Sequence, residues 1–306
     1  MNWLKKGLLV FFMILSSPSF AYYYGVRSFG MGGSGLAYPS LSDAVFLNAS
    51  ALAFAPSGFE AQARYNPWYS DQEAGASIAY SKNNSGIGLG YLQQSPFSKT
   101  QNNSSGDYSY KTYQLLGSIG ALFLNKNLAI GFTPSLSLSL YQYGSLKVRT
   151  TELSLQDISF TINLGGETYL GFVFNQPTQI PEGKVLITGG LWQDFGKYLS
   201  NATDLGIYYS KNTSQFAINL STGFEIRTND LYFIQFGYLD SVTPSGQYSE
   251  SNSGLQRSRY IFIGNSLNLG KALRLDIMAN AYRVSQSVES SKGILDTLSA
   301  SLTAHL

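Results

Sequence analysis

Apolar and polar residues alternate along most of this 306-residue chain with a period of two. The last ten residues, 297–306, are the clearest case, with leucine or alanine at every even position and serine, threonine or histidine at every odd one. The same pattern recurs at 59–66, 128–140, 215–227 and 273–282. Alternation over this length predicts β-strands that have one apolar and one polar face.

Polar breaks between the alternating stretches come in two lengths. Short breaks lie at 82–85, 125–127, 228–230 and 270–272, and longer ones at 94–107, 175–183, 242–254 and 286–293. Outer-membrane barrels join their strands by short periplasmic turns and longer external loops. A first strand at 59–66 that starts in the periplasm places all short breaks on one side and all long breaks on the other. Counting 144–151 as a strand of its own gives fourteen strands. The stretch 141–159 is the least defined, and twelve is the alternative count.

Composition separates two fold classes that both produce alternation, a soluble β-sandwich and a membrane barrel. Only 12% of the residues are charged, about half the usual quarter, while Tyr (22), Phe (19) and Gly (31) are abundant and Cys is absent. The apolar positions of the strands form long runs that are nearly free of charge. Without cysteine, no disulfide can stabilise a small secreted domain. We therefore expect an all-β fold, a transmembrane antiparallel β-barrel of about fourteen strands.

The first 21 residues have the features of a secretory signal peptide. Lys5 and Lys6 precede a short apolar core at 7–15, and small residues occupy the peptidase positions at 19 and 21. That core is shorter than the roughly 20 residues of a spanning helix. We expect a signal peptide at 1–21, a plug at 22–57 and a barrel at 58–306, in the outer membrane of a Gram-negative bacterium.

Charge argues against a nucleic-acid partner. The chain has 20 Lys and Arg against 18 Asp and Glu, so loss of Lys5 and Lys6 with the signal peptide leaves the two signs balanced. A neutral chain has no net positive field to attract nucleic acid. The partners that we expect are outer-membrane lipid, the barrel-assembly machinery and a hydrophobic small molecule. The assembly machinery usually reads a terminal strand that ends in an aromatic residue, and Leu306 departs from that.

Residues 30–35 read Gly-Met-Gly-Gly-Ser-Gly, which matches the G-x-G-x-x-G fingerprint of dinucleotide-binding folds. That chemistry needs a strand before the motif and a helix directly after it, and neither is predicted here. The region 22–57 also lacks alternation, and a barrel of fourteen strands is too wide for its own side chains to fill. We expect this region to be an ordered plug with a short helix over 43–53 capped by Ser42; a disordered periplasmic leader is the alternative. The expected plug residues are Arg27, Phe29, Gly30, Gly32, Gly33, Gly35, Asp43, Phe46, Asn48 and Leu52.

The stretches 25–37 and 43–52 resemble the N-terminal hatch of the FadL-like outer-membrane transport family. That family has an arginine, a Gly-Met-Gly-Gly-like run, an Asp-Ala pair and an Asn-Pro-Ala step before its first strand. Here the last step is Asn48-Ala49-Ser50, which departs from the family pattern. The resemblance implies a fourteen-stranded barrel with a small hatch, passive uptake of hydrophobic compounds such as fatty acids or aromatic hydrocarbons, and lateral exit beside a kinked strand.

Two further groups of residues are candidates for function. Glycine weakens the packing of a strand, and Gly86, Gly88 and Gly90 in one early strand are a candidate lateral gate, although glycines also occur where strands simply curve. Four charged residues in the polar phase of later strands form a candidate charge network that lines a wet lumen or grips the plug: Glu225, Arg227, Arg274 and Asp276.

Catalysis is not expected. The chain has one histidine, His305, and no cysteine, so it offers no nucleophile and base pair except His305 with Ser299 or Ser301, where no orienting acid is apparent. We expect no metal and no cofactor. The function that we expect is an uptake channel for hydrophobic compounds. The alternatives are a non-transporting barrel scaffold that binds a secretion or envelope partner and, less favoured, a general polar porin.

Overall fold

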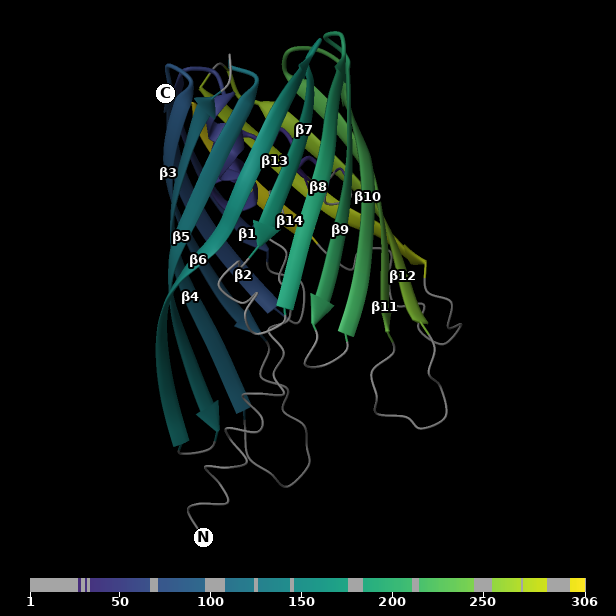
Figure 1. The fold of residues 1–306 in the computed structure, drawn as a ribbon. Coiled ribbons are helices and arrows are strands. Elements are labelled where there is room, and N and C mark those ends of the chain that lie inside the picture. Colours follow the sequence, from purple (N-terminus) through teal and green to yellow (C-terminus); the bar gives the residue numbers. More distant parts are fainter. Residues whose placement is uncertain are drawn as a thin grey trace.

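The computed structural model is a closed antiparallel barrel of strands β1 to β14, paired in chain order and closed by β1 against β14 (Figure 1). The structure describes residues 27–28, 31, 34–66, 71–96, 108–123, 126–143, 146–175, 184–210, 215–244, 255–270, 272–284 and 298–305. The strands are β1 Gly58–Asn66, β2 Asp71–Lys82, β3 Ser85–Pro96, β4 Tyr108–Phe123, β5 Leu128–Tyr143, β6 Leu146–Gly165, β7 Thr168–Asn175, β8 Lys184–Phe195, β9 Leu199–Ser210, β10 Gln215–Arg227, β11 Tyr232–Pro244, β12 Leu255–Asn268, β13 Leu273–Val284 and β14 Leu298–His305. The expected fold class and strand count are confirmed.

The alternation of the sequence becomes the two faces of the wall. On β10, Phe216, Leu220 and Phe224 point outward with 41–45% of their surface exposed, whereas Ser221 and Glu225 are buried inside the barrel. The exterior is thus an apolar surface suited to lipid, and the lumen face is polar. No helix among the described residues is long and apolar enough to cross a membrane.

The least defined part of the sequence is arranged differently from the expectation. The stretch 144–151 is not a strand of its own, because from Leu146 it forms the first part of β6, which runs on without interruption to Gly165. A register shift against β5 at Thr133 and Pro134 lets this long strand stay paired. Proline has no N–H for the ladder, which explains why the irregularity lies there.

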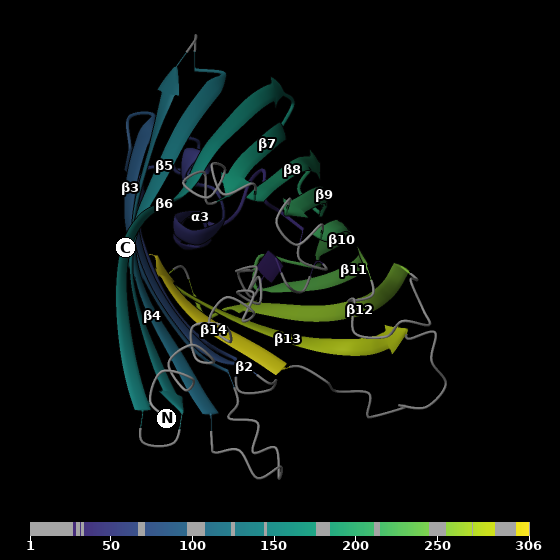
Figure 2. The same ribbon diagram turned by 60° about the horizontal axis from the view of Figure 1, so that its bottom comes forward.

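Ahead of β1, the helix α3 (Leu41–Leu47) and the 3₁₀ helix η1 (Ala49–Ala53) lie inside the barrel (Figure 2). The cap was expected at Ser42, but the N-cap is Ser40, whose hydroxyl accepts a hydrogen bond from the backbone N–H of Asp43. The expected single helix over 43–53 is divided at Asn48, whose backbone is extended (φ −165°, ψ 91°). The signal peptide expected at 1–21 lies outside the described residues. So do four of the expected plug residues: Phe29, Gly30, Gly32 and Gly33.

Candidate functional site: the N-terminal segment in the lumen

The described residues of 27–53, here called the N-terminal segment, bury an apolar face against the inner wall. All seven residues of α3 are buried, and Val45, Phe46 and Leu52 belong to one apolar cluster with wall residues that include Leu92 and Leu116. Burial of side chains of this size contributes about 1.5–3 kcal/mol each. A segment with so much buried apolar surface docks as a folded element of the lumen.

The wall accommodates this segment through eight inward-facing glycines, here called the glycine bed: Gly86, Gly88, Gly90, Gly120, Gly131, Gly171, Gly190 and Gly223. A Cβ at Gly86 would lie 2.7 Å from the Cβ of Leu52, and one at Gly90 would lie 2.7 Å from Cε1 of Phe46. All eight lie in the halves of their strands that end at the short turns. The absence of side chains lets the segment lie directly on strand backbone at this end of the barrel.

Asn48 ties the break between the two helices to the wall. Its side-chain Nδ2 donates to the backbone oxygen of Leu36 and to Oγ1 of Thr161 on β6, both at 2.9 Å. Its Oδ1 accepts from the N–H and the hydroxyl of Ser50, so it caps η1. Every polar atom of the buried amide therefore has a partner, which explains an asparagine at 0% exposure.

Further polar contacts hold the segment on other sides of the lumen. The backbone N–H of Leu36 donates to Oδ2 of Asp204 on β9 at 2.9 Å, and the hydroxyl of Ser118 on β4 donates to the backbone oxygen of Val45 at 2.7 Å. Such wall contacts pair backbone groups that would otherwise be buried in the lumen without a partner.

A single carboxylate joins the helix to the two strands that close the barrel. Glu60 on β1 accepts from the backbone N–H of Ser42 at 2.9 Å and from the Ser42 hydroxyl. Its other oxygen lies 3.2 Å from Nδ1 of His305 on β14. His305 therefore contacts the carboxylate that binds Ser42 of the N-terminal segment.

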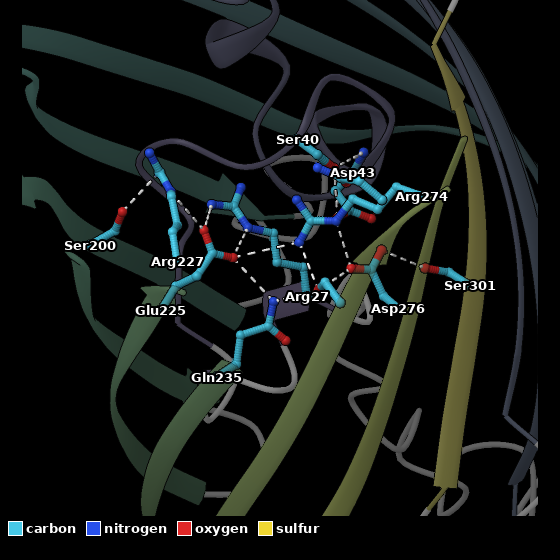
Figure 3. Close-up of polar contacts among 12 residues, drawn as sticks. Arg27, Ser40, Asp43, Ser200, Glu225, Arg227, Gln235, Arg274, Asp276 and Ser301 are labelled. Carbon is cyan, nitrogen blue, oxygen red and sulfur yellow. Dashed lines mark hydrogen bonds and ion pairs between the residues drawn. The ribbon is translucent and has the colours of Figure 1, made fainter. Parts of the chain in front are cut away.

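Across the lumen, Arg27 of the N-terminal segment meets charged side chains of the wall, which Figure 3 shows except for Asp194. Together they are here called the arginine cluster: Arg27, Asp194, Glu225, Arg227, Arg274 and Asp276. Arg27 donates from Nε and Nη2 to the two oxygens of Glu225 at 2.7 and 2.8 Å, a two-bond pairing with fixed geometry. Arg274 lies 3.5 Å from Glu225 and donates to Asp276 at 2.8 Å, and Arg227 lies 3.5 Å from Glu225.

Burial and charge act in opposite directions on Arg27. Burial alone would lower the pKa of its guanidinium, but the Glu225 carboxylate outweighs this and raises the pKa above its ordinary value. The guanidinium also lies 4.9 Å from the ring centroid of Trp192, a cation–π contact. Burial raises the pKa of the neighbouring Tyr38 to about 12, and that ring stacks on Tyr169 at 4.3 Å.

The structure brings together all four residues of the expected charge network and places the described plug residues, from Arg27 to Leu52, in the lumen. Gly35 has a positive φ of 111°, which the expected tight turn requires. Sequence reasoning missed Asp194 on β8, which pairs with Arg227, and Gln235 on β11, which donates to Glu225. It also missed five of the eight glycines of the bed. The signal available for them was their occurrence at inward-facing positions of several strands.

Gly86, Gly88 and Gly90 lie under α3 and η1, which gives them a packing role, and the gate assigned to them stays a prediction. The pairing of β3 with β2 is continuous from Ser85 to Pro96, and its pairing with β4 is continuous from Ser85 to Gln94. No group of three or more metal-ligating side chains occurs in the described parts of the chain.

Comparisons with known proteins find solved structures that share this fold. No family model and no curated protein sequence matches the chain. Among solved structures, the CymD monoaromatic hydrocarbon channel superposes with a TM-score of 0.68 at 12% identity, covering 92% of this chain and 96% of that one. The Ralstonia pickettii toluene transporter TbuX gives 0.64 at 11% identity (93% and 97%), and a Pseudomonas aeruginosa FadL homologue gives 0.61 at 10% (92% and 98%). At these identities the likeness establishes the fold. By fold, therefore, the chain is similar to these barrel proteins.

Proposed function

We propose that the chain is a channel in the outer membrane of a Gram-negative bacterium for passive uptake of small hydrophobic compounds, with the N-terminal segment as its plug. The observation that carries this proposal is the docking of that segment on the glycine bed, inside a barrel whose fold is that of hydrocarbon channels. The segment fills lumen that a fourteen-stranded wall leaves open. The partners proposed with it are the lipid around the barrel, the assembly machinery and the transported compound.

A lateral exit is the finer part of this proposal. To leave along the barrel axis, an apolar compound that reaches the plug must pass Arg27, Glu225 and Arg274, at the end of the barrel that carries the short turns. Contact with these charged groups makes that path unfavourable for an apolar compound. The wall is the alternative. The glycines of β3 are one candidate place for an opening. A second lies between β4 and β5, where Leu116 pairs with Ser135 and Ile119 with Phe132 but no residues pair in between. Either place can supply an opening once strands separate.

Uptake of labelled toluene by cells that express the chain tests the proposal. We expect faster uptake than in cells that carry an empty vector, unaffected by an uncoupler because the transport is passive. Benzyl alcohol is the control solute. Because it diffuses into both strains, its uptake rate should differ less between them than that of toluene. In planar bilayers the intact chain should carry little ion current, because the plug occupies the lumen.

Two results would contradict this function. An unchanged uptake rate, with the barrel shown to be inserted and folded, would remove the transport role, and a stoichiometric protein recovered from crosslinked membranes would then favour the scaffold. A steady ion current through the intact chain would favour a polar porin.

A further inference from the structure

A cavity of about 690 Å³ lies at the end of the barrel that carries the short turns, beside the arginine cluster. Its walls come from the N-terminal segment through Arg27, from the β8–β9 turn through Lys197 and Tyr198, and from strand residues that include Arg227 and Arg274. The volume falls within the roughly 300–1,000 Å³ of small-molecule pockets. Neither the plug nor the uptake proposal uses this space.

Charge is distributed unevenly around the cavity. The side chain of Arg227 is 30% exposed and that of Arg274 is 16% exposed, whereas those of Glu225 and Asp276 are 1% and 4% exposed. In the arginine cluster (Figure 3) the guanidinium groups are therefore more exposed than the carboxylates that balance them, although Glu225 also lines the cavity. Four cationic residues line the cavity against two acids, Glu225 and Asp230, so an anion that enters meets a net positive field.

Lys197 adds a positive charge that is not engaged in a carboxylate pair among the described residues. The acids that line the cavity with it are Glu225, which Arg27 already pairs, and Asp230. The Lys197 ammonium lies 5.4 Å from the ring centroid of Tyr198. On the opposite side the Arg274 guanidinium lies 4.9 Å from the ring of Phe233. Each cation thus stands next to an aromatic surface, so the cavity offers charge and apolar contact together.

We propose that this cavity is a binding site for a small organic acid, with its carboxylate held by Lys197 and Arg227 and its apolar body against Tyr198 or Phe233. The arginine cluster already holds one carboxylate of the chain itself, Glu225, in a two-bond pair with Arg27. A planar carboxylate suits the guanidinium fork in a way that a neutral hydrocarbon does not. The proposal concerns binding in this cavity and holds whether or not the chain transports hydrophobic compounds.

Calorimetric titration of the purified full chain in a non-ionic detergent tests this site, with benzoate as the probe and benzyl alcohol as its neutral counterpart. We expect benzoate to bind at least about tenfold more tightly than benzyl alcohol, because only the anion gains charge-assisted hydrogen bonds. The variant Lys197→Gln should weaken benzoate binding about tenfold. Lys82→Gln is the matched control, an exposed lysine beside another short turn, and should change nothing.

Several outcomes would overturn the proposal. Equal binding of benzoate and benzyl alcohol would show an apolar site, and equal losses in Lys197→Gln and Lys82→Gln would show diffuse surface attraction. Inorganic phosphate that binds as tightly as benzoate would remove the assignment to organic acids. Because the readout is binding, failure of toluene uptake would leave this result intact, and failure of benzoate binding would leave the uptake proposal intact.

Discussion

On the β3 to β5 side of the lumen the N-terminal segment lies on five of the eight bed glycines, whereas on the β10 to β13 side it meets charged side chains beside a single one, Gly223. The first contact depends on shape, since a single added methyl group has no room at Gly86 or Gly88. The second depends on charge, and leaves a cavity beside Arg27. The comparison suggests that the glycine side fixes where the segment sits and the charged side fixes how firmly its first residues are held.

The largest effect should come from filling the glycine side. In Gly88→Leu the new side chain would occupy the place of the Val45 side chain, so we expect the segment to be displaced altogether, at a cost above the usual 1–3 kcal/mol of overpacking. Single-channel recording should then show a large ion current where the parent chain shows little. Gly117→Leu is the matched control, because its nearest neighbour is Leu89 Cδ2 at 3.9 Å, and it should behave as the parent. A closed Gly88→Leu channel would contradict the glycine bed.

A smaller effect should follow from breaking the charged side. Glu225→Gln leaves Arg27 and Arg274 without their shared carboxylate, and removal of one partner of a buried pair typically costs about 3 kcal/mol or more. We expect faster hydrogen exchange at the start of the segment and intermittent rather than steady current. The double variant Arg27→Gln with Glu225→Gln should recover part of the loss, because the buried charge left by the single change is gone. The control Glu152→Gln, exposed on β6, should leave exchange unchanged.

The smallest effect concerns pH and the glycine-side helix. Burial raises the pKa of Asp43 from 3.8 to about 6, against the Ser40 hydrogen bond and Arg64, which lower it, while Glu60 and Asp276 raise it further. Its Oδ1 has no hydrogen-bond partner among the described residues. The docked state therefore binds the proton more tightly than the undocked state, so docking is most stable below about pH 4 and weakens as pH rises from about 4 to 6.

Hydrogen exchange of the α3 amides between pH 4 and 7, corrected for the intrinsic rates, measures this effect. We expect protection to fall across that range in the parent chain and to stay level in Asp43→Asn, which keeps a side chain of the same size without a titrating group. His305 near Glu60 and the other acids are identical in both proteins, so only the difference between the two profiles belongs to Asp43. Parallel profiles would remove Asp43 as the cause.

Local patterns were enough to predict the barrel. Each strand has one face toward lipid and one toward the lumen. The alternation within a few positions of residues such as Phe224 and Glu225 therefore indicates which face each side chain is on. The pattern was weakest at 141–159, where the bulge at Pro134 and the length of β6 have no simple periodic signature. There the sequence suggested a separate strand, and the structure has a continuous one.

The site was less predictable because its contacts join distant parts of the chain. Arg27 and Glu225 are 198 residues apart, and nothing in the sequence around either one indicates the other. The glycines of β3 were noticed, but without knowledge of Val45 above them their lack of side chains suggested weakness in the wall rather than close packing against it. The helix break at Asn48 depends likewise on Thr161, a partner on β6.

The contacts of Glu60 bear on the order of assembly. This one carboxylate is bound by Ser42 of the segment and by His305 of the last strand, and β1 and β14 are the strands whose pairing completes the cylinder. We therefore expect docking of the N-terminal segment and closure of the β1–β14 seam to be coupled steps of assembly, because one carboxylate stabilises both.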